Sequence, residues 1–312
     1  MLIETIDAAC STCGSREADE VGRSRDYEFG TCSNEFVFVE CRQCGLTYLK
    51  NRPALHTLGI IYPPSYYRYA AFLGPVTTRL RAIVQGGRVR MLKRLVPRGA
   101  TVMEVGCGEG QLLQAIKADG DPSWRVVGVD ISEQACAALR AAGIEMHCAQ
   151  FEALEWPVGS VDVVIMNQVI EHLADPRACV ARAMSLLRPG GRLFIETPSV
   201  HSWDRDWVAP DRWGGWHCPR HWSLYTRESL TALLEQQGLE VERSEYLPSP
   251  FVWAHSMQNA VRDRPRWRWA SNLLSERSVP ALMAYTTLDI VQRWVAGRTS
   301  NMRVIARKPV AA

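Results

Sequence analysis

The sequence predicts an α/β protein built on a parallel sheet, and two observations carry this prediction. Between residues 100 and 200, short apolar segments alternate with helical segments of about 10–15 residues, a pattern typical of βαβ units. The apolar segments are continuous, which indicates strands that are covered on both faces of the sheet. With 312 residues, the chain is long enough for such a domain and an appendage.

The expected elements follow one another in a regular order as far as residue 200. Strands are expected at 101–108, 125–132, 144–151, within 161–173 and at 191–198, and helices at 111–120, 133–143 and 178–191. Further on, Thr226 followed by an acidic residue is typical of a helix start, here at 226–238. A strand at 239–247, a helical insertion at 248–299 and a last strand at 301–308 complete the chain.

A glycine-rich turn follows the first of these strands. The segment EVGCGEG contains Gly106, Gly108 and Gly110, and this spacing differs from the G-x-G-x-x-G of dinucleotide sites. Glycines there allow the backbone to approach a bulky cofactor closely. Asp130 ends the second strand, where a carboxylate either accepts hydrogen bonds from a ribose or caps the next helix.

The ordered motifs of residues 99–200 resemble those of the class I S-adenosylmethionine (SAM) dependent methyltransferases. The matching segments are EVGCGEG, VVGVDIS, GSVDVVIMNQVIEHL and LLRPGGRLFIETP. The resemblance implies a Rossmann-like seven-stranded sheet whose last strand is antiparallel. The residues that it implies around SAM are Glu104, Gly106, Gly108 and Gly110 at the methionine end, Asp130 at the ribose, Gln150 and Phe151 near the adenine, and Asn167. Phe151 could equally belong to the core.

Two Cys-x2-Cys-Gly pairs near the N-terminus predict a structural zinc site. The four cysteines are Cys10, Cys13, Cys41 and Cys44. Pairs with this spacing are typical of zinc ribbons, and four protein ligands leave no position open for catalysis. Cys32 could replace one ligand, although its spacing fits less well.

The expected domains are therefore a zinc ribbon, a connector and a methyltransferase domain. Their ranges are 1–50, 51–98 and 99–312, and the last contains lid segments at 201–225 and 248–299. The ribbon, the tyrosine-rich segment 62–69 and the segment GWHCPRHWSLY resemble a bacterial subgroup of methyltransferases found in specialised metabolism and sugar modification. That resemblance suggests that the tyrosines cover SAM or the substrate, and packing between domains is the alternative.

Glu171 and His172 are the candidate catalytic residues, because they follow the fourth strand beside the expected methyl donor. An oxygen or nitrogen acceptor usually needs a base, and His172 could supply it. Glu171 could be a base or a metal ligand. Both residues occur here in many members of the superfamily whatever the substrate, so a structural role is an equal alternative.

Five of the eleven tryptophans lie between residues 203 and 222, mixed with arginine and histidine. One chemistry that uses both kinds of residue is C-methylation of a prenyl (geranyl or farnesyl) diphosphate. Tryptophan would stabilise the carbocation, Glu171 would remove a proton, and arginines with Mg²⁺ would hold the diphosphate. The alternatives are a lid that packs over any flat substrate, and O- or C-methylation of a sugar or phenol with His172 or His221 as base.

Composition argues against several other classes of protein. The net charge of +3 is small for a nucleic-acid binder, so an RNA-modifying or RNA-binding zinc-ribbon protein is a secondary hypothesis. No apolar segment is long enough to span a membrane, and the N-terminus does not resemble a signal peptide. We therefore expect a cytoplasmic enzyme with a small-molecule substrate, whose oligomeric state the sequence does not indicate.

Overall fold

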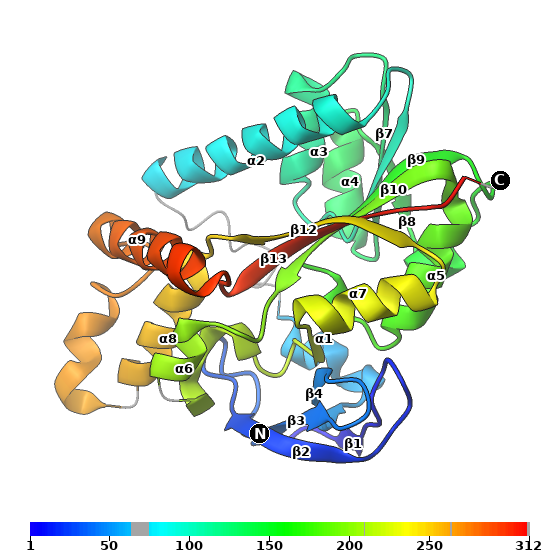
Figure 1. The fold of residues 1–312 in the computed structure, drawn as a ribbon. Helices are drawn as coiled ribbons and strands as arrows, with labels where there is room; N and C mark the ends of the chain where they lie inside the picture. Colours follow the sequence, from blue (N-terminus) through cyan, green and yellow to red (C-terminus); the bar gives the residue numbers. More distant parts are fainter. Residues whose placement is uncertain (64–74, 209, 263, 311–312) are drawn as a thin grey trace.

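A computed structural model describes residues 1–63, 75–208, 210–262 and 264–310, and a seven-stranded sheet forms its centre (Figure 1). The strands in spatial order are β12 (Glu240–Leu247), β13 (Asn301–Arg307), β10 (Leu187–Pro198), β9 (Val161–Asn167), β6 (Thr101–Val105), β7 (Arg125–Asp130) and β8 (Glu145–Cys148). All neighbours from β10 to β8 are parallel, and β13 is antiparallel to both of its neighbours. The expected Rossmann-like methyltransferase sheet is thus confirmed.

Helices cover both faces of this sheet, which explains why its central strands β6, β7 and β9 are mostly apolar. On one face, α2 (Pro75–Leu95) and α3 (Gln111–Asp119) pack against Val102 and alternate residues of neighbouring strands. On the other face, α5 (Pro176–Leu186) and α7 (Arg227–Gln236) pack against Met103 and its counterparts. Helix α4 (Glu133–Ala141) closes the edge beside β8. Figure 1 shows α2 and α3 on the side of the sheet opposite α7.

The order of the strands places a crevice next to β6. After β6 the chain adds β7 and β8 on one side, and it then crosses to add β9 on the other side. Helices that follow the two halves therefore diverge, and a crevice opens where the carboxyl ends of β6 and β9 meet. The short helices η3 (Phe151–Ala153) and η4 (Ile170–His172) follow β8 and β9.

The N-terminal cysteine module, residues 1–50, shares its main sheet with a strand from a distant part of the chain. Strands β2 (Ala18–Ser24), β3 (Phe36–Cys41) and β4 (Thr47–Leu49) are joined by β11 (Ser223–Leu224), which pairs antiparallel with β4. A separate pair consists of β1 (Thr5–Asp7) and β5 (Asn51–Pro53), and η1 (Leu55–Thr57) and α1 (Leu58–Ile61) follow. The module is therefore attached to the catalytic half through a shared sheet.

The tryptophan-rich segment forms α6 (Trp203–Trp207), η5 (Pro210–Arg212), η6 (Gly214–Trp216) and β11. Trp213, Trp216 and Trp222 are buried, and each indole N–H donates a hydrogen bond within the protein. Trp216 also stacks on Phe38 of β3, with ring centroids 4.1 Å apart. These three tryptophans consequently fill the space between the cysteine module and the segment that carries them.

The insertion before β13 is helical, as its sequence predicts. It contains α8 (Pro250–Arg262), η7 (Pro265–Ser271) and α9 (Val279–Ala296). In the described ranges, no helix is both long enough and apolar enough to cross a membrane. Of the segment 62–69, only residues 62 and 63 belong to the described part of the chain, so most of the predicted tyrosine cover lies outside it.

A completely buried ion pair connects the cysteine module to the segment before β11. Arg220 and Asp26 have no exposed side-chain surface, and their two closest contacts are 3.1 and 3.2 Å. Burial alone would raise the pKa of Asp26, but the Arg220 guanidinium lowers it below its ordinary value. Arg220 Nε also donates to the carbonyl oxygen of Ile61, so one side chain holds three segments of the chain together.

We expect Asp26→Ala to destabilise the fold by about 3–5 kcal/mol, because it leaves the guanidinium buried without its carboxylate. The matched control is Asp19→Ala, which breaks an exposed ion pair with Arg42 and should leave the stability almost unchanged. Chemical denaturation of both variants measures the difference. Equal losses of stability would show that the buried pair does not hold the segments together.

Candidate active site

A cavity of about 780 Å³ lies at the carboxyl ends of β6, β7 and β9. Six of the eight residues predicted to contact a cofactor line it: Glu104, Gly106, Gly108, Gly110, Asp130 and Asn167. The sheet thus brings together residues from three strands at the crevice beside β6.

The three glycines of the turn have different reasons to lack a side chain. All three have positive φ, at 62°, 50° and 67° along the chain. A Cβ on Gly106 would lie 2.7 Å from Val169, and one on Gly110 would lie 2.4 Å from Leu139. A Cβ on Gly108 would have no neighbour within 4 Å. Gly106 and Gly110 therefore permit close packing, whereas Gly108 keeps open space above the turn.

Asp130 is held in place by two backbone amides. Its Oδ2 accepts from the N–H of Gly108 and its Oδ1 from the N–H of Ser132, both at 2.8 Å. The residue that caps α4 is Ser132, whose hydroxyl accepts from Ala135 N–H. The helix-cap alternative for Asp130 is therefore wrong, and its carboxylate is fixed on the wall of the cavity.

Glu104 is a buried carboxyl group on the same wall, and its Oε2 has no hydrogen-bond partner. Burial raises its pKa to about 8, against the opposing charge of Arg88. Arg88 is itself paired with Glu196 and donates to Asn167 Oδ1 at 3.1 Å. A cationic ligand in the cavity would supply the partner that Glu104 lacks, and SAM, with its sulfonium and ammonium groups, fits this requirement.

Gln150 and Phe151 are not among the residues that line this cavity. Strand β8 ends at Cys148, earlier than the expected end at residue 151, so Gln150 and Phe151 lie beyond the strand. Phe151 lies in the main hydrophobic core and Gln150 is exposed. Ser132 and Ala135 of the α4 region line the cavity instead, so the adenine contacts of Gln150 and Phe151 stay a prediction.

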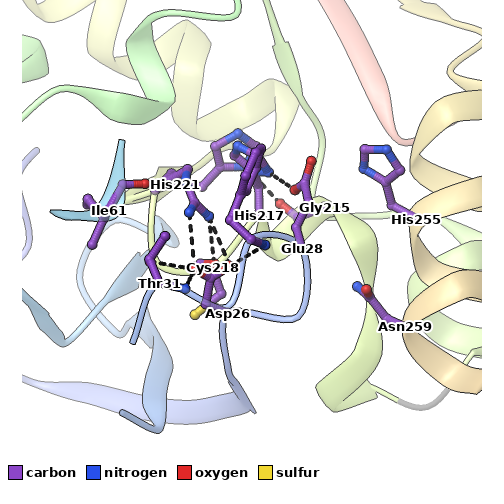
Figure 2. Close-up of polar contacts among 12 residues, drawn as sticks. Asp26, Glu28, Thr31, Ile61, Gly215, His217, Cys218, His221, His255 and Asn259 are labelled. Carbon is purple, nitrogen blue, oxygen red and sulfur yellow. Dashed lines mark hydrogen bonds and ion pairs between the residues drawn. The ribbon is translucent and has the colours of Figure 1, made fainter. Parts of the chain in front are cut away.

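A second cavity, of about 340 Å³, shares a wall with the first. It lies between the segment 24–28, η6, α8 and the segment 271–277. Three residues line both cavities: Glu28, His217 and His255. Figure 2 shows Glu28 between His217 and His255, which come from different parts of the chain. A molecule in each cavity would meet at this shared wall.

His217 and Glu28 form a short hydrogen-bonded pair on the shared wall, with 2.5 Å between Nδ1 and Oε2. Burial would raise the pKa of Glu28, but the charges of His217 and His255 lower it to about 2. His255 lies 3.6 Å from Glu276. Burial would lower the pKa of His255, yet the charges of Glu28 and Glu276 raise it above the ordinary value.

Sequence reasoning did not select these three residues as candidates for catalysis. His217 belongs to the GWHCPRH segment that the sequence marks as unusual, and that segment is the only available signal. Glu28 and His255 belong to no motif, and they are 189 and 38 residues from His217 along the chain. Their approach depends on how the cysteine module and α8 pack against η6.

Glu171 and His172, the predicted catalytic pair, lie on η4 and line neither cavity. Glu171 is completely buried, and burial raises its pKa to about 8. Thr197 donates a hydrogen bond to its Oε2, whereas its Oε1 has no hydrogen-bond partner. His172 Nδ1 lies 3.1 Å from the carbonyl oxygen of Arg220 and 3.1 Å from the hydroxyl of Tyr62. Burial, followed by the charge of His217, lowers the pKa of His172 to about 3.

The four predicted zinc ligands converge in the cysteine module. The sulfur atoms of Cys10, Cys13, Cys41 and Cys44 all lie within 4.8 Å of one another. Gly14 and Gly45 follow the two pairs with φ of 76° and 70°, a conformation that favours glycine. Backbone N–H groups of Thr12 and Cys13 point at the Cys10 sulfur. Four soft thiolates in this arrangement suit Zn²⁺. Cys32 lies in a different apolar cluster and is not part of the group.

A model of the methyltransferase domain family matches residues 77–244, which is more than half of the chain. The chain belongs to the methyltransferase-domain family. The matched range contains the glycine turn, Asp130 and η4, and it leaves the cysteine module and α9 outside.

Individual relatives agree with this family. A probable SAM-dependent methyltransferase of Mycolicibacterium smegmatis is 37% identical over 146 residues, 46% of this chain and 53% of that protein. A ubiquinone biosynthesis O-methyltransferase of Idiomarina loihiensis is 35% identical over 127 residues, 38% and 51% of the two chains. The chain thus spans about half the length of these relatives.

A solved structure from Thermotoga maritima shows the same fold. It is described as a SAM-dependent methyltransferase and possible histamine N-methyltransferase. The TM-score is 0.51 at 16% identity, with 80% of this chain and 98% of the other covered. This likeness concerns the architecture of the sheet and its helices.

We expect SAM affinity to rise with pH, because a cation binds the ionised form of Glu104, whose pKa is about 8 in the ligand-free protein. The rise should approach about tenfold per pH unit below that pKa. Calorimetry between about pH 6 and 7.5 avoids the titration of the ligand's own amine. Glu104→Gln should bind more weakly and with less dependence on pH; an unchanged pH dependence in this variant would contradict the role of Glu104.

Proposed function

We propose that this protein is a SAM-dependent methyltransferase that methylates a small-molecule acceptor. The observation that carries this proposal is the meeting of the two cavities at Glu28, His217 and His255. SAM in the larger cavity supplies an electrophilic methyl group on its sulfonium. The smaller cavity is the acceptor site, and the acceptor's nucleophilic atom lies at the shared wall.

In this proposal, His217 is the general base. Its Nδ1–H donates to the Glu28 carboxylate, so Nε2 is the basic nitrogen of the neutral ring. A hydroxyl or amine acceptor transfers its proton to Nε2 as it attacks, and Glu28 stabilises the imidazolium that results. Asp130 binds the ribose hydroxyls, Glu104 faces the cationic end of the cofactor, and the turn at Gly108 allows close approach.

The positions of Glu171 and His172 make His217 the better candidate for the base. The His172 and His217 ring centroids are 6.1 Å apart, and His217 lines both cavities whereas Glu171 and His172 line neither. His221 lines neither cavity as well, and its ring centroid is 4.9 Å from that of His217. The Idiomarina relative is named for O-methylation, which also favours an acceptor that needs a base.

We further propose that the cysteine module holds one structural Zn²⁺ ion on Cys10, Cys13, Cys41 and Cys44. The lid segments 201–225 and 248–299 both border the acceptor cavity, the first through residues 213, 214 and 216–218 and the second through residues 255, 258, 259, 262, 271, 272 and 275–277. Closure over the acceptor is therefore the role that we assign to them.

Prenyl diphosphate C-methylation is the second candidate, and one observation favours it. Trp213 and Trp216 line the acceptor cavity together with Arg262 and Arg277. Tryptophan faces stabilise a carbocation, and arginines hold a diphosphate. Much of the remaining wall is polar, however, because Asn259, Gln258 and several serines line it, and it offers little apolar surface to a prenyl chain. A polar acceptor therefore fits better, and Mg²⁺ belongs only to the diphosphate alternative.

Mass spectrometry with a panel of acceptors separates these candidates. The panel contains a sugar phosphate, a catechol, and geranyl and farnesyl diphosphate with Mg²⁺. We expect a product heavier by one methyl group from a polar hydroxylated acceptor. Methylation of a prenyl diphosphate alone would replace the polar-acceptor proposal, and conversion of no acceptor by protein that fails to bind SAM would contradict the function itself.

His217→Gln should lower kcat by roughly 10²–10⁴-fold on the acceptor found in that panel, because it removes the base. Its SAM affinity should stay unchanged. Glu28→Gln should lower kcat less and shift the pH profile, since the ring loses its carboxylate. His147→Gln, on β8 and away from both cavities, is the matched control. A wild-type kcat in His217→Gln would exclude His217 as the base.

A further inference from the structure

Behind His217, the buried Glu171 and His221 converge with the partly buried His172 in a group that the methyl transfer proposed above does not use. One ligand atom from each of Glu171, His172 and His221 lies within 4.8 Å of the others. His172 Nε2 is 4.0 Å from Glu171 Oε1, and the rings of the two histidines have centroids 4.7 Å apart. Two residues come from η4 and the third from the segment before β11, so two distant parts of the chain build the group.

A backbone carbonyl oxygen lies next to Nδ1 in each of the two histidines. His221 Nδ1 lies 2.8 Å from the carbonyl oxygen of Gly215, and His172 Nδ1 lies 3.1 Å from that of Arg220. A carbonyl oxygen only accepts hydrogen bonds, so the His221 Nδ1 carries the proton and its Nε2 carries the lone pair. His172 adopts the same tautomer when the Tyr62 hydroxyl, which also lies 3.1 Å from its Nδ1, accepts a hydrogen bond from this nitrogen. Histidines that bind metals through Nε2 are typically oriented in this way by the other ring nitrogen.

Glu171 supplies the third donor, and its state is unusual. Thr197 donates to Oε2 at 2.9 Å, while Oε1 is completely buried and has no hydrogen-bond partner. An unpartnered carboxylate oxygen in the protein interior is costly. Oε1 is the oxygen nearer to His172, so it belongs to the same group as the Nε2 lone pair.

We propose that Glu171, His172 and His221 bind a divalent transition-metal ion, distinct from the zinc of the four cysteines. Two imidazole nitrogens and one carboxylate oxygen suit Zn²⁺, Fe²⁺ or Co²⁺ and do not suit Mg²⁺ or Ca²⁺. Zinc bonds of about 2.0–2.2 Å place tetrahedral ligands about 3.4 Å apart, so movements of about 1 Å would close the site. The ion would connect η4 to the segment before β11, directly behind the shared wall of the two cavities.

The proposal needs neither methyl transfer nor an identified acceptor, so metal content tests it directly. Purified protein is stripped with a chelator, saturated with Zn²⁺, dialysed and analysed by mass spectrometry for metal per chain. We expect about two Zn²⁺ in the wild type and about one in Glu171→Gln and in His221→Gln. His147→Gln is the matched histidine control and should keep both, whereas Cys13→Ser with Cys44→Ser should lose the cysteine-bound ion only.

One Zn²⁺ in the wild type, with no loss in Glu171→Gln, would overturn the proposal, and it would leave both the cysteine site and the methyltransferase activity unaffected. Circular dichroism and SAM binding show whether each variant is folded. If Glu171→Gln fails to fold, Co²⁺ titration of the wild type decides. The site is supported if a second equivalent of Co²⁺ adds absorption but no thiolate-to-cobalt charge-transfer band. It is excluded if the absorption saturates after one equivalent, bound by the thiolates.

Discussion

The buried pair of Arg220 and Asp26 is the contact on which the rest of the site depends. A guanidinium without exposed surface is stable in the interior only if its charge and its donors have partners, and here Asp26, Ile61 and Cys218 accept from it. The same stretch of chain carries His217 and His221, and the carbonyl of Arg220 orients His172. One charge therefore sets the geometry of the shared cavity wall and of the histidines behind it.

The sheet and the cofactor cavity could be predicted because their signals are local. Continuous apolar strands separated by helices specify the parallel sheet, and a glycine turn after the first strand specifies where a cofactor approaches. Each glycine of that turn has a positive φ, which other residues rarely adopt, so the local backbone enforces the motif. Glu104 and Asp130 follow from the same pattern, because both lie at or near the ends of strands whose positions the pattern fixes.

The acceptor side could not be predicted, because it is made from contacts between distant segments. Glu28 reaches His217 from 189 residues away, and β11 joins the cysteine module through two residues that show no strand pattern of their own. The tryptophans do not by themselves indicate a substrate, for a physical reason. A buried indole needs a partner for its N–H, and Trp213, Trp216 and Trp222 have found theirs in Asp204, Pro210 and Pro219, so their burial is explained without a substrate.

The histidines around this wall divide according to the partner of one ring nitrogen. His217 has a carboxylate at Nδ1, and a carboxylate stabilises the imidazolium that a base must become. His172 and His221 have carbonyl oxygens at Nδ1, and these raise the pKa of the two rings less than burial lowers it. The carboxylate thus directs proton transfer to the ring that faces the cavities, and it leaves the two inner rings suited to binding a cation.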